Sequence, residues 1–105
     1  MPIALGNIAN STASNAYVST GNTAITFLSL TNYSASNVIA NVFVVPSGST
    51  AGNLNLVLSQ IEIATLDTYQ LYAGGEKLLL SNGDSVQANA NANNSITTVT
   101  SYTTI

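Results

Sequence analysis

Short alternations of apolar and polar residues recur along the chain and are separated by turn residues about every 8 to 12 positions. A period of two places apolar side chains on one face of a β-strand, and the abundance of Thr, Val, Ile and Tyr favours the same conformation. The pattern predicts an all-β fold, a compact antiparallel β-sandwich of jelly-roll or immunoglobulin-like type with about eight short strands. The expected strands span residues 16–20, 24–32, 37–45, 54–63, 66–72, 78–80, 85–90 and 95–102.

Two of these strands carry large apolar residues on both faces. Strict alternation in 24–32 places Ile25 and Phe27 on the face opposite to Leu28 and Leu30, and 37–45 has the same feature. The residues that face away from the expected core are Ile25, Phe27, Ile39, Phe43 and Val45. A single sandwich buries only one face of each sheet well, so we expect these side chains to contact another subunit or a larger scaffold. The expected assembly is a homo-oligomer, with a trimer favoured.

The expected strand 54–63 does not keep one apolar face along its length. Its apolar positions shift by one residue near Ser59 and Gln60, which predicts a β-bulge or a break at that point. The preceding segment, 47–53, is rich in Ser and Gly and predicts a flexible loop.

Residues 1–15 differ from the rest of the chain because they lack sustained alternation. We expect them to form an extended N-terminal arm and residues 16–105 to form a single β-sandwich domain. The aliphatic residues Ile3, Leu5 and Ile8 are the expected anchors of this arm, through strand addition to a neighbouring subunit or a scaffold. The alternative is a frayed terminus.

Composition argues against catalysis. The chain has one basic and four acidic residues and no His or Cys, while Ser, Thr and Asn fill more than a third of its positions. Acid–base catalysis, thiolate chemistry and zinc binding depend on residue types that are absent or scarce here. We therefore expect no enzymatic activity, no cofactor and no catalytic or metal-binding residues. Asp84 follows the Asn82-Gly83 pair typical of a tight hairpin turn, and we expect it to stabilise that turn rather than to bind calcium.

The formal net charge is -3, and Lys77 is the only basic residue. Without a cluster of basic side chains to neutralise phosphates, we expect no nucleic-acid partner. No apolar run reaches the roughly 18 residues of a membrane span, so we expect no membrane partner, and the N-terminus lacks the features of a signal peptide. An interface of this chain should depend on apolar contacts and backbone hydrogen bonds, and little on salt.

Four segments of the sequence carry a resemblance to a known family. They are AYVSTGNTAITFLSLTN with the Val-rich NVIANVFVVPSGSTAGN, then LLLSNGDSVQA, and finally SITTVTSY. Together they resemble the small β-sandwich decoration or cement proteins of tailed-bacteriophage capsids, over residues 16–102. The resemblance implies a virion structural protein on the capsid surface, often trimeric, that binds the assembled shell of major capsid protein and bridges neighbouring capsomers. A tail, neck or baseplate accessory protein is the alternative within the same class.

A second class of function rests on the tyrosines. Tyrosine offers both a flat ring and a hydroxyl group, which suit it to sugar binding. The tyrosines are Tyr17, Tyr33, Tyr69, Tyr72 and Tyr102. A carbohydrate-binding or adhesin-like module is therefore the further alternative.

Overall fold

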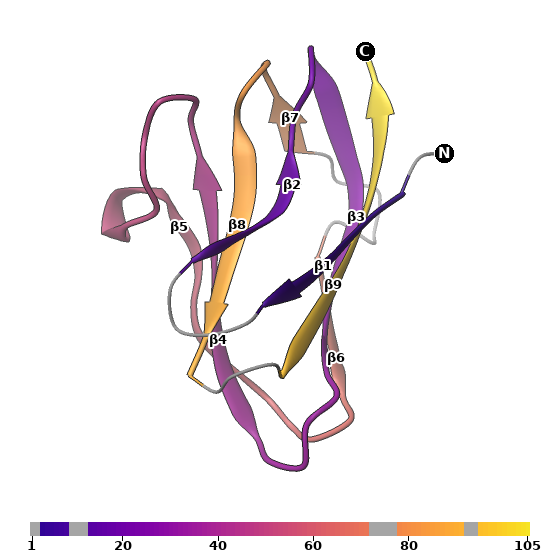
Figure 1. Cartoon of the computed structure of the whole chain (residues 1–105), viewed down its shortest axis with the longest axis vertical. Coiled ribbons are helices and arrows are strands. Elements are labelled where there is room, and N and C mark those ends of the chain that lie inside the picture. The colour runs from indigo at the N-terminus through magenta and orange to yellow at the C-terminus, as the bar shows by residue number, and fades with distance from the viewer. Residues whose placement is uncertain (1–2, 9–12, 72–77, 92–94) are drawn as a thin grey trace.

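Two antiparallel β-sheets pack face to face in the computed structural model, which describes residues 3–8, 13–71, 78–91 and 95–105 (Figure 1). The strands are β1 (Ile3–Ile8), β2 (Ser14–Val18), β3 (Thr23–Asn32), β4 (Val38–Val45), β5 (Leu56–Ile63), β6 (Thr68–Leu71), β7 (Leu78–Leu80), β8 (Ser85–Ala90) and β9 (Ile96–Thr104). A short 3-10 helix, η1 (Asn53–Asn55), precedes β5, and these described ranges contain no α-helix. The predicted all-β sandwich is confirmed.

The strand order is that of a double-sheet jelly roll. The first sheet runs β1-β9-β3-β6, with β7 also pairing with β3, and the second sheet runs β2-β8-β4-β5. The first four strands alternate between the two sheets. The start of the chain pairs with its end, since β1 lies beside β9 and β2 lies beside β8. Of the two sandwich types that the sequence pattern allowed, the topology is therefore the jelly roll.

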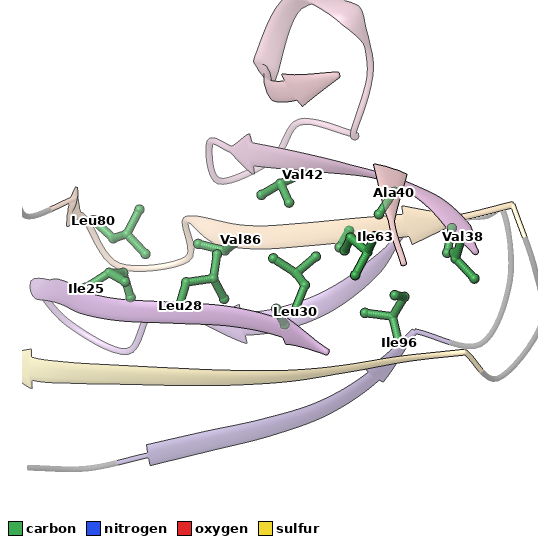
Figure 2. Close-up of a cluster of buried hydrophobic side chains, with 13 residues drawn as sticks. Ile25, Leu28, Leu30, Val38, Ala40, Val42, Ile63, Leu80, Val86 and Ile96 are labelled. Carbon is green, nitrogen blue, oxygen red and sulfur yellow. The ribbon is translucent and has the colours of Figure 1, made fainter. Parts of the chain in front are cut away.

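The core lies between the two sheets, and both contribute side chains to it (Figure 2). Its larger members are Ile25, Leu28, Leu30, Val38, Val42, Ile63, Leu80, Val86 and Ile96. Small residues of β4 and β8, among them Ala40, Ala88 and Ala90, complete the cluster where the sheets approach each other. The alternating Val and Ala positions of these strands thus form the inner face of the second sheet.

The prediction that Ile25 faces away from the core is wrong. The pairing of β3 with β9 shifts register between Ile25 and Phe27, so Thr26 is an extra residue in β3. A bulge of this kind reverses the side on which the preceding residues point. Ile25 consequently joins Leu28 and Leu30 in the core, with no exposed surface, whereas Phe27 stays on the outer face, half-buried.

The prediction that Phe43 and Val45 are exposed contacts is also wrong for the monomer, where they are 7% and 2% exposed. Both lie on the outer face of β4, away from the core. The segment that links β4 to β5 folds back on this side, with η1 against β4 (Figure 2). Its residues 49–51 line a hollow together with Gln87, the cross-strand neighbour of Phe43. The loop predicted to be flexible therefore packs beside the outer apolar residues of β4.

Within the predicted arm 1–15, residues 3–8 form a strand of this domain. β1 pairs with β9 over its whole length, from Ile3 opposite Ser101 to Ile8 opposite Ile96, and β2 starts at Ser14. The domain therefore includes part of the segment 1–15. The alternation of β1 was hidden because its inward residues are the small Ala4 and Gly6.

Two local predictions have different outcomes. The bulge near Ser59 and Gln60 is confirmed, because the β4–β5 register shifts there and Gln60 has a φ of 54°. The turn around Gly83 forms, with Gly83 at a φ of 88°. However, it joins β7 of the first sheet to β8 of the second, so it is not a hairpin turn.

Candidate protein-docking surface

An apolar patch lies on the outer face of the first sheet, where β1, β9 and β3 run side by side. We define it as Ile3, Leu5, Phe27 and Val99. Register places Leu5 directly opposite Val99, and places Ile3 and Phe27 on either side of Ser101. Directly opposed residues share one face of a sheet, so the four side chains form one surface.

The two aliphatic residues of β1 are the most exposed part of this patch. Ile3 is 61% exposed and Leu5 is 76% exposed, whereas Phe27 and Val99 are half-buried between their neighbours. β1 is also the edge strand of its sheet. An exposed edge with apolar side chains is a surface that favours contact with another protein.

The strands that carry the patch are uncharged. None of the residues of β1, β3 and β9 is Asp, Glu, Lys or Arg. The patch is instead framed by hydroxyl groups, including those of Ser29, Thr97 and Ser101, which share its face. Binding at this surface therefore requires no ion pair from these strands.

Close packing beneath β1 holds the patch in place. A Cβ atom on Gly6 would lie 2.6 Å from Thr98 Oγ1 and 3.6 Å from the backbone oxygen of Asn15, in β2. The absence of a side chain at Gly6 allows β1 to lie against both β9 and β2. Ile3 and Leu5 alternate with the inward residues and so point outward.

The predicted contact residues separate into several groups. Ile3, Leu5 and Phe27 come together in the patch. Ile39 is 39% exposed but lies on the outer face of the other sheet, and the side chain of Ile8 lies outside the described residues. Ile25, Phe43 and Val45 are buried within the monomer. Those three residues therefore present no surface to a partner.

Val99 is the patch residue that sequence reasoning missed. It is the one aliphatic residue on its face of β9, where its neighbours Thr97 and Ser101 are polar. A single apolar residue between two polar ones carries no amphipathic signal. Only its pairing with Leu5 in the sheet places Val99 in the patch.

Asp84 stabilises its turn, as predicted. Its carboxylate oxygens accept hydrogen bonds from the backbone amides of Ser81 and Ser47, both at 2.9 Å. The side-chain oxygen of Asn82 accepts one from the amide of Gly21 at 2.8 Å. These hydrogen bonds join the turn at residues 81–84 to the loop that contains Gly21 and to the loop that contains Ser47. Within the described part of the chain, no three His, Cys, Asp or Glu side chains form a group that could hold a metal ion.

The described tyrosines do not form one exposed surface. The rings of Tyr17 and Tyr102 lie 4.3 Å apart, and both pack against the core, as does Tyr69. Tyr33 is 43% exposed, and Tyr72 lies outside the described residues. A sugar platform built from several tyrosines is therefore absent from this part of the structure.

Over the described ranges, no helix has the length and apolar character needed to cross a membrane. Comparisons of the chain with protein-family models, with curated proteins and with solved structures found no match.

Proposed function

We propose that this protein is a non-enzymatic structural subunit of a tailed-bacteriophage virion, of the capsid-decoration type, that docks on the assembled shell of major capsid protein. The observation that carries the proposal is the exposed, uncharged apolar patch on β1, β9 and β3. The resemblance of residues 16–102 to decoration proteins supplies the identity of the partner. The proposed location of the protein is the capsid surface of the virion.

The physical basis of docking is the burial of the patch. Burying a fully exposed aliphatic side chain contributes about 1.5–3 kcal/mol, so Ile3 and Leu5 offer a substantial contribution in a small area. Edge strand β1 adds backbone groups that can pair with a strand of the partner. Because no charge lies on these strands, association should persist at high salt.

The fold is compatible with this role by analogy. Double-sheet jelly rolls form capsid domains of viruses as well as lectin domains and enzymes, so topology alone does not choose among them. The patch favours a docking role over catalysis.

We also propose a homo-oligomer, with a trimer favoured, although fewer residues support it than the sequence indicated. Ile25, Phe43 and Val45 no longer support it, since they are buried in the monomer. The remaining support is the patch itself, which either a second subunit or the capsid can cover.

The proposal can be tested by immunogold electron microscopy with antibodies against the purified protein, applied to phage particles from the source that carries the gene. We expect label on the capsid. Label on the tail, neck or baseplate would favour the alternative structural role, and particles without label would overturn both.

The patch can be tested by adding purified variants to particles that lack the protein. Leu5→Asp should lose binding, because it places a charge in the centre of an apolar contact. Leu54→Asp is the matched control, since Leu54 is fully exposed in the β4–β5 segment, outside the patch. Equal binding by both variants would remove the patch from the proposal.

A further inference from the structure

A shallow depression of about 330 Å³ lies on the outer face of the second sheet, the sheet that does not carry the patch. Its lining residues are Ile39, Asn41, Gln60, Asn89, Ala90 and Asn91. Four of these six residues have amide side chains. They come from β4, β5 and β8 and from the position just after β8. The sequence pattern singled out none of these amides as a site.

Strand register explains how the amides come together. Asn41 of β4 lies directly opposite Asn89 of β8. Two residues further along, on the same face, the backbone oxygen of Ile39 accepts a hydrogen bond from the backbone amide of Asn91 at 3.0 Å, and the backbone amide of Ile39 donates to Asn91 Oδ1 at the same distance. The depression is thus framed by two rows of residues that are neighbours on the outer face of the sheet.

Hydrogen bonds hold three of the four side-chain amides in place, those of Asn41, Asn89 and Asn91. Asn41 Nδ2 donates to Asn89 Oδ1 at 2.8 Å, and Asn41 Oδ1 accepts from the backbone amide of Gln60 at 2.7 Å. The second bond fixes the bulge in β5. Gln60 has a φ of 54°, a region that non-glycine residues rarely occupy. Strain of this kind costs on the order of 1–3 kcal/mol and is concentrated at functional sites.

The depression also has an apolar part and an acidic neighbour. Ile39 is 39% exposed, which provides an aliphatic contact. Glu62 lies directly opposite Ile39 on β5 and is exposed, so it is a neighbour of one lining residue without being a lining residue itself. Side-chain amides both donate and accept hydrogen bonds, whereas a carboxylate only accepts.

We propose that this depression binds a single neutral hexose unit of a glycan. A sugar ring presents hydroxyl groups, which match the side-chain amides and the neighbouring Glu62 carboxylate, and a C–H face, which matches Ile39. No basic side chain is among the lining residues, and the exposed Glu62 lies opposite one of them, which disfavours phosphates and acidic sugars. The absence of an aromatic side chain from the lining disfavours nucleobases, which depend on stacking.

This activity is separate from docking on the capsid. The depression is built by β4, β5 and β8, whereas the patch is built by β1, β3 and β9. The two surfaces belong to opposite sheets of the sandwich, so one protein can dock through the first and leave the second accessible. The proposal does not depend on the virion role.

The test is a titration of the full-length, ¹⁵N-labelled protein with glucose, galactose, mannose and N-acetylglucosamine, each up to about 20 mM. A shallow site for a small ligand should have a Kd on the order of 1 mM. We expect saturable changes in the amide resonances of Ile39, Asn41, Gln60 and Asn91 with at least one sugar. Absence of binding to all four sugars, or changes located elsewhere, would overturn the proposal.

Gln60→Gly is the decisive variant. Glycine adopts a positive φ without strain, so the bulge should persist while the side chain is lost. We expect sugar binding to weaken by roughly 5-fold or more, corresponding to the loss of about one hydrogen bond. Leu66→Gly is the matched control, because Leu66 also has a positive φ, of 62°, but lies outside the lining residues. Equal weakening by both variants, or by neither, would refute the role of Gln60.

Glu62→Gln provides a second measurement that does not alter the bulge. Replacing the carboxylate by an amide keeps the size of the side chain and removes its charge-assisted hydrogen bond to a hydroxyl. We expect roughly 3-fold or greater weakening of sugar binding with an unchanged Tm. Full binding by both Glu62→Gln and Gln60→Gly would exclude this depression as the sugar site.

Discussion

Thr98 Oγ1 lies 2.6 Å from the position that a Cβ atom on Gly6 would occupy, and the two residues are cross-strand partners in β9 and β1. The contact is on the inner face of the sheet, since Thr98 is fully buried. Gly6 is therefore needed for a close approach and not for its backbone freedom. This approach holds edge strand β1 on the sandwich and presents Ile3 and Leu5 to the outside.

Gly6→Ala should destabilise the protein by about 1–3 kcal/mol, because the added methyl group collides with the buried Thr98 hydroxyl. Thermal or urea unfolding measures the loss. Gly52→Ala is the control, since nothing lies within 4 Å of a Cβ at that position and its φ of -172° is open to any residue. Equal stability of the two variants would show that β1 shifts freely.

Thr100→Val should stabilise the protein by about 1 kcal/mol. Thr100 is fully buried, and its hydroxyl has no hydrogen-bond partner among the described residues. Valine has nearly the same shape and removes the cost of the unpaired group. Thr97→Val, on the half-buried outer face of the same strand, should change stability little. A loss of stability in Thr100→Val, measured by urea unfolding, would reveal a partner for this hydroxyl.

Asn32→Asp should cost about 3 kcal/mol or more. The fully buried Asn32 side chain donates to the carbonyl oxygens of Ser36 and Ile63 at 2.8 and 2.9 Å, and accepts from Ser34. A carboxylate cannot donate these bonds and would place a buried charge against two carbonyl groups.

Asn37→Asp is the matched control for that change. The Asn37 side chain is exposed, and its oxygen accepts a hydrogen bond from the amide of Thr65, a role that a carboxylate can keep. Its unfolding midpoint should stay close to that of the unmodified protein. If both variants unfold at the same midpoint, the buried hydrogen bonds of Asn32 do not stabilise this loop region.

Phe43→Asp should unfold the protein and not merely dissociate an oligomer. Phe43 is 7% exposed in the monomer, so a carboxylate there is placed among apolar groups without a partner. Circular dichroism should show loss of β-structure in this variant, while Leu5→Asp remains folded. A folded, monomeric Phe43→Asp would restore this residue as a subunit contact.

Removal of residues 1–8 should lower the Tm, because it deletes β1 and leaves the edge of β9 without its partner. The free energy lost includes the backbone pairing and the contacts of Ala4 and Gly6 with the neighbouring strands. Differential scanning calorimetry gives the measurement. An unchanged Tm would mean that the segment behaves as the arm that its weak alternation indicated.

Features that depend on local chemistry were predictable. The strands β3 to β5, β8 and β9 follow from alternation, and the bulge at Gln60 follows from a shift in that alternation. The turn at Asn82 and Gly83 follows from residue types that adopt turn conformations, and Asp84 binds its backbone amides as expected. Each of these depends on residues that are close in sequence.

The composition and pattern of the chain by themselves determined an all-β sandwich with few charges, but only tertiary structure decided which faces are buried. One inserted residue, Thr26, reversed the side of Ile25, and the β4–β5 segment came to lie on the side of β4 that carries Phe43. The patch and the depression each join strands that are distant in sequence, and their residues become neighbours through the order of strands in a sheet. That order depends on how both sheets bury their inner faces at once, which is a property of the whole chain and not of any segment.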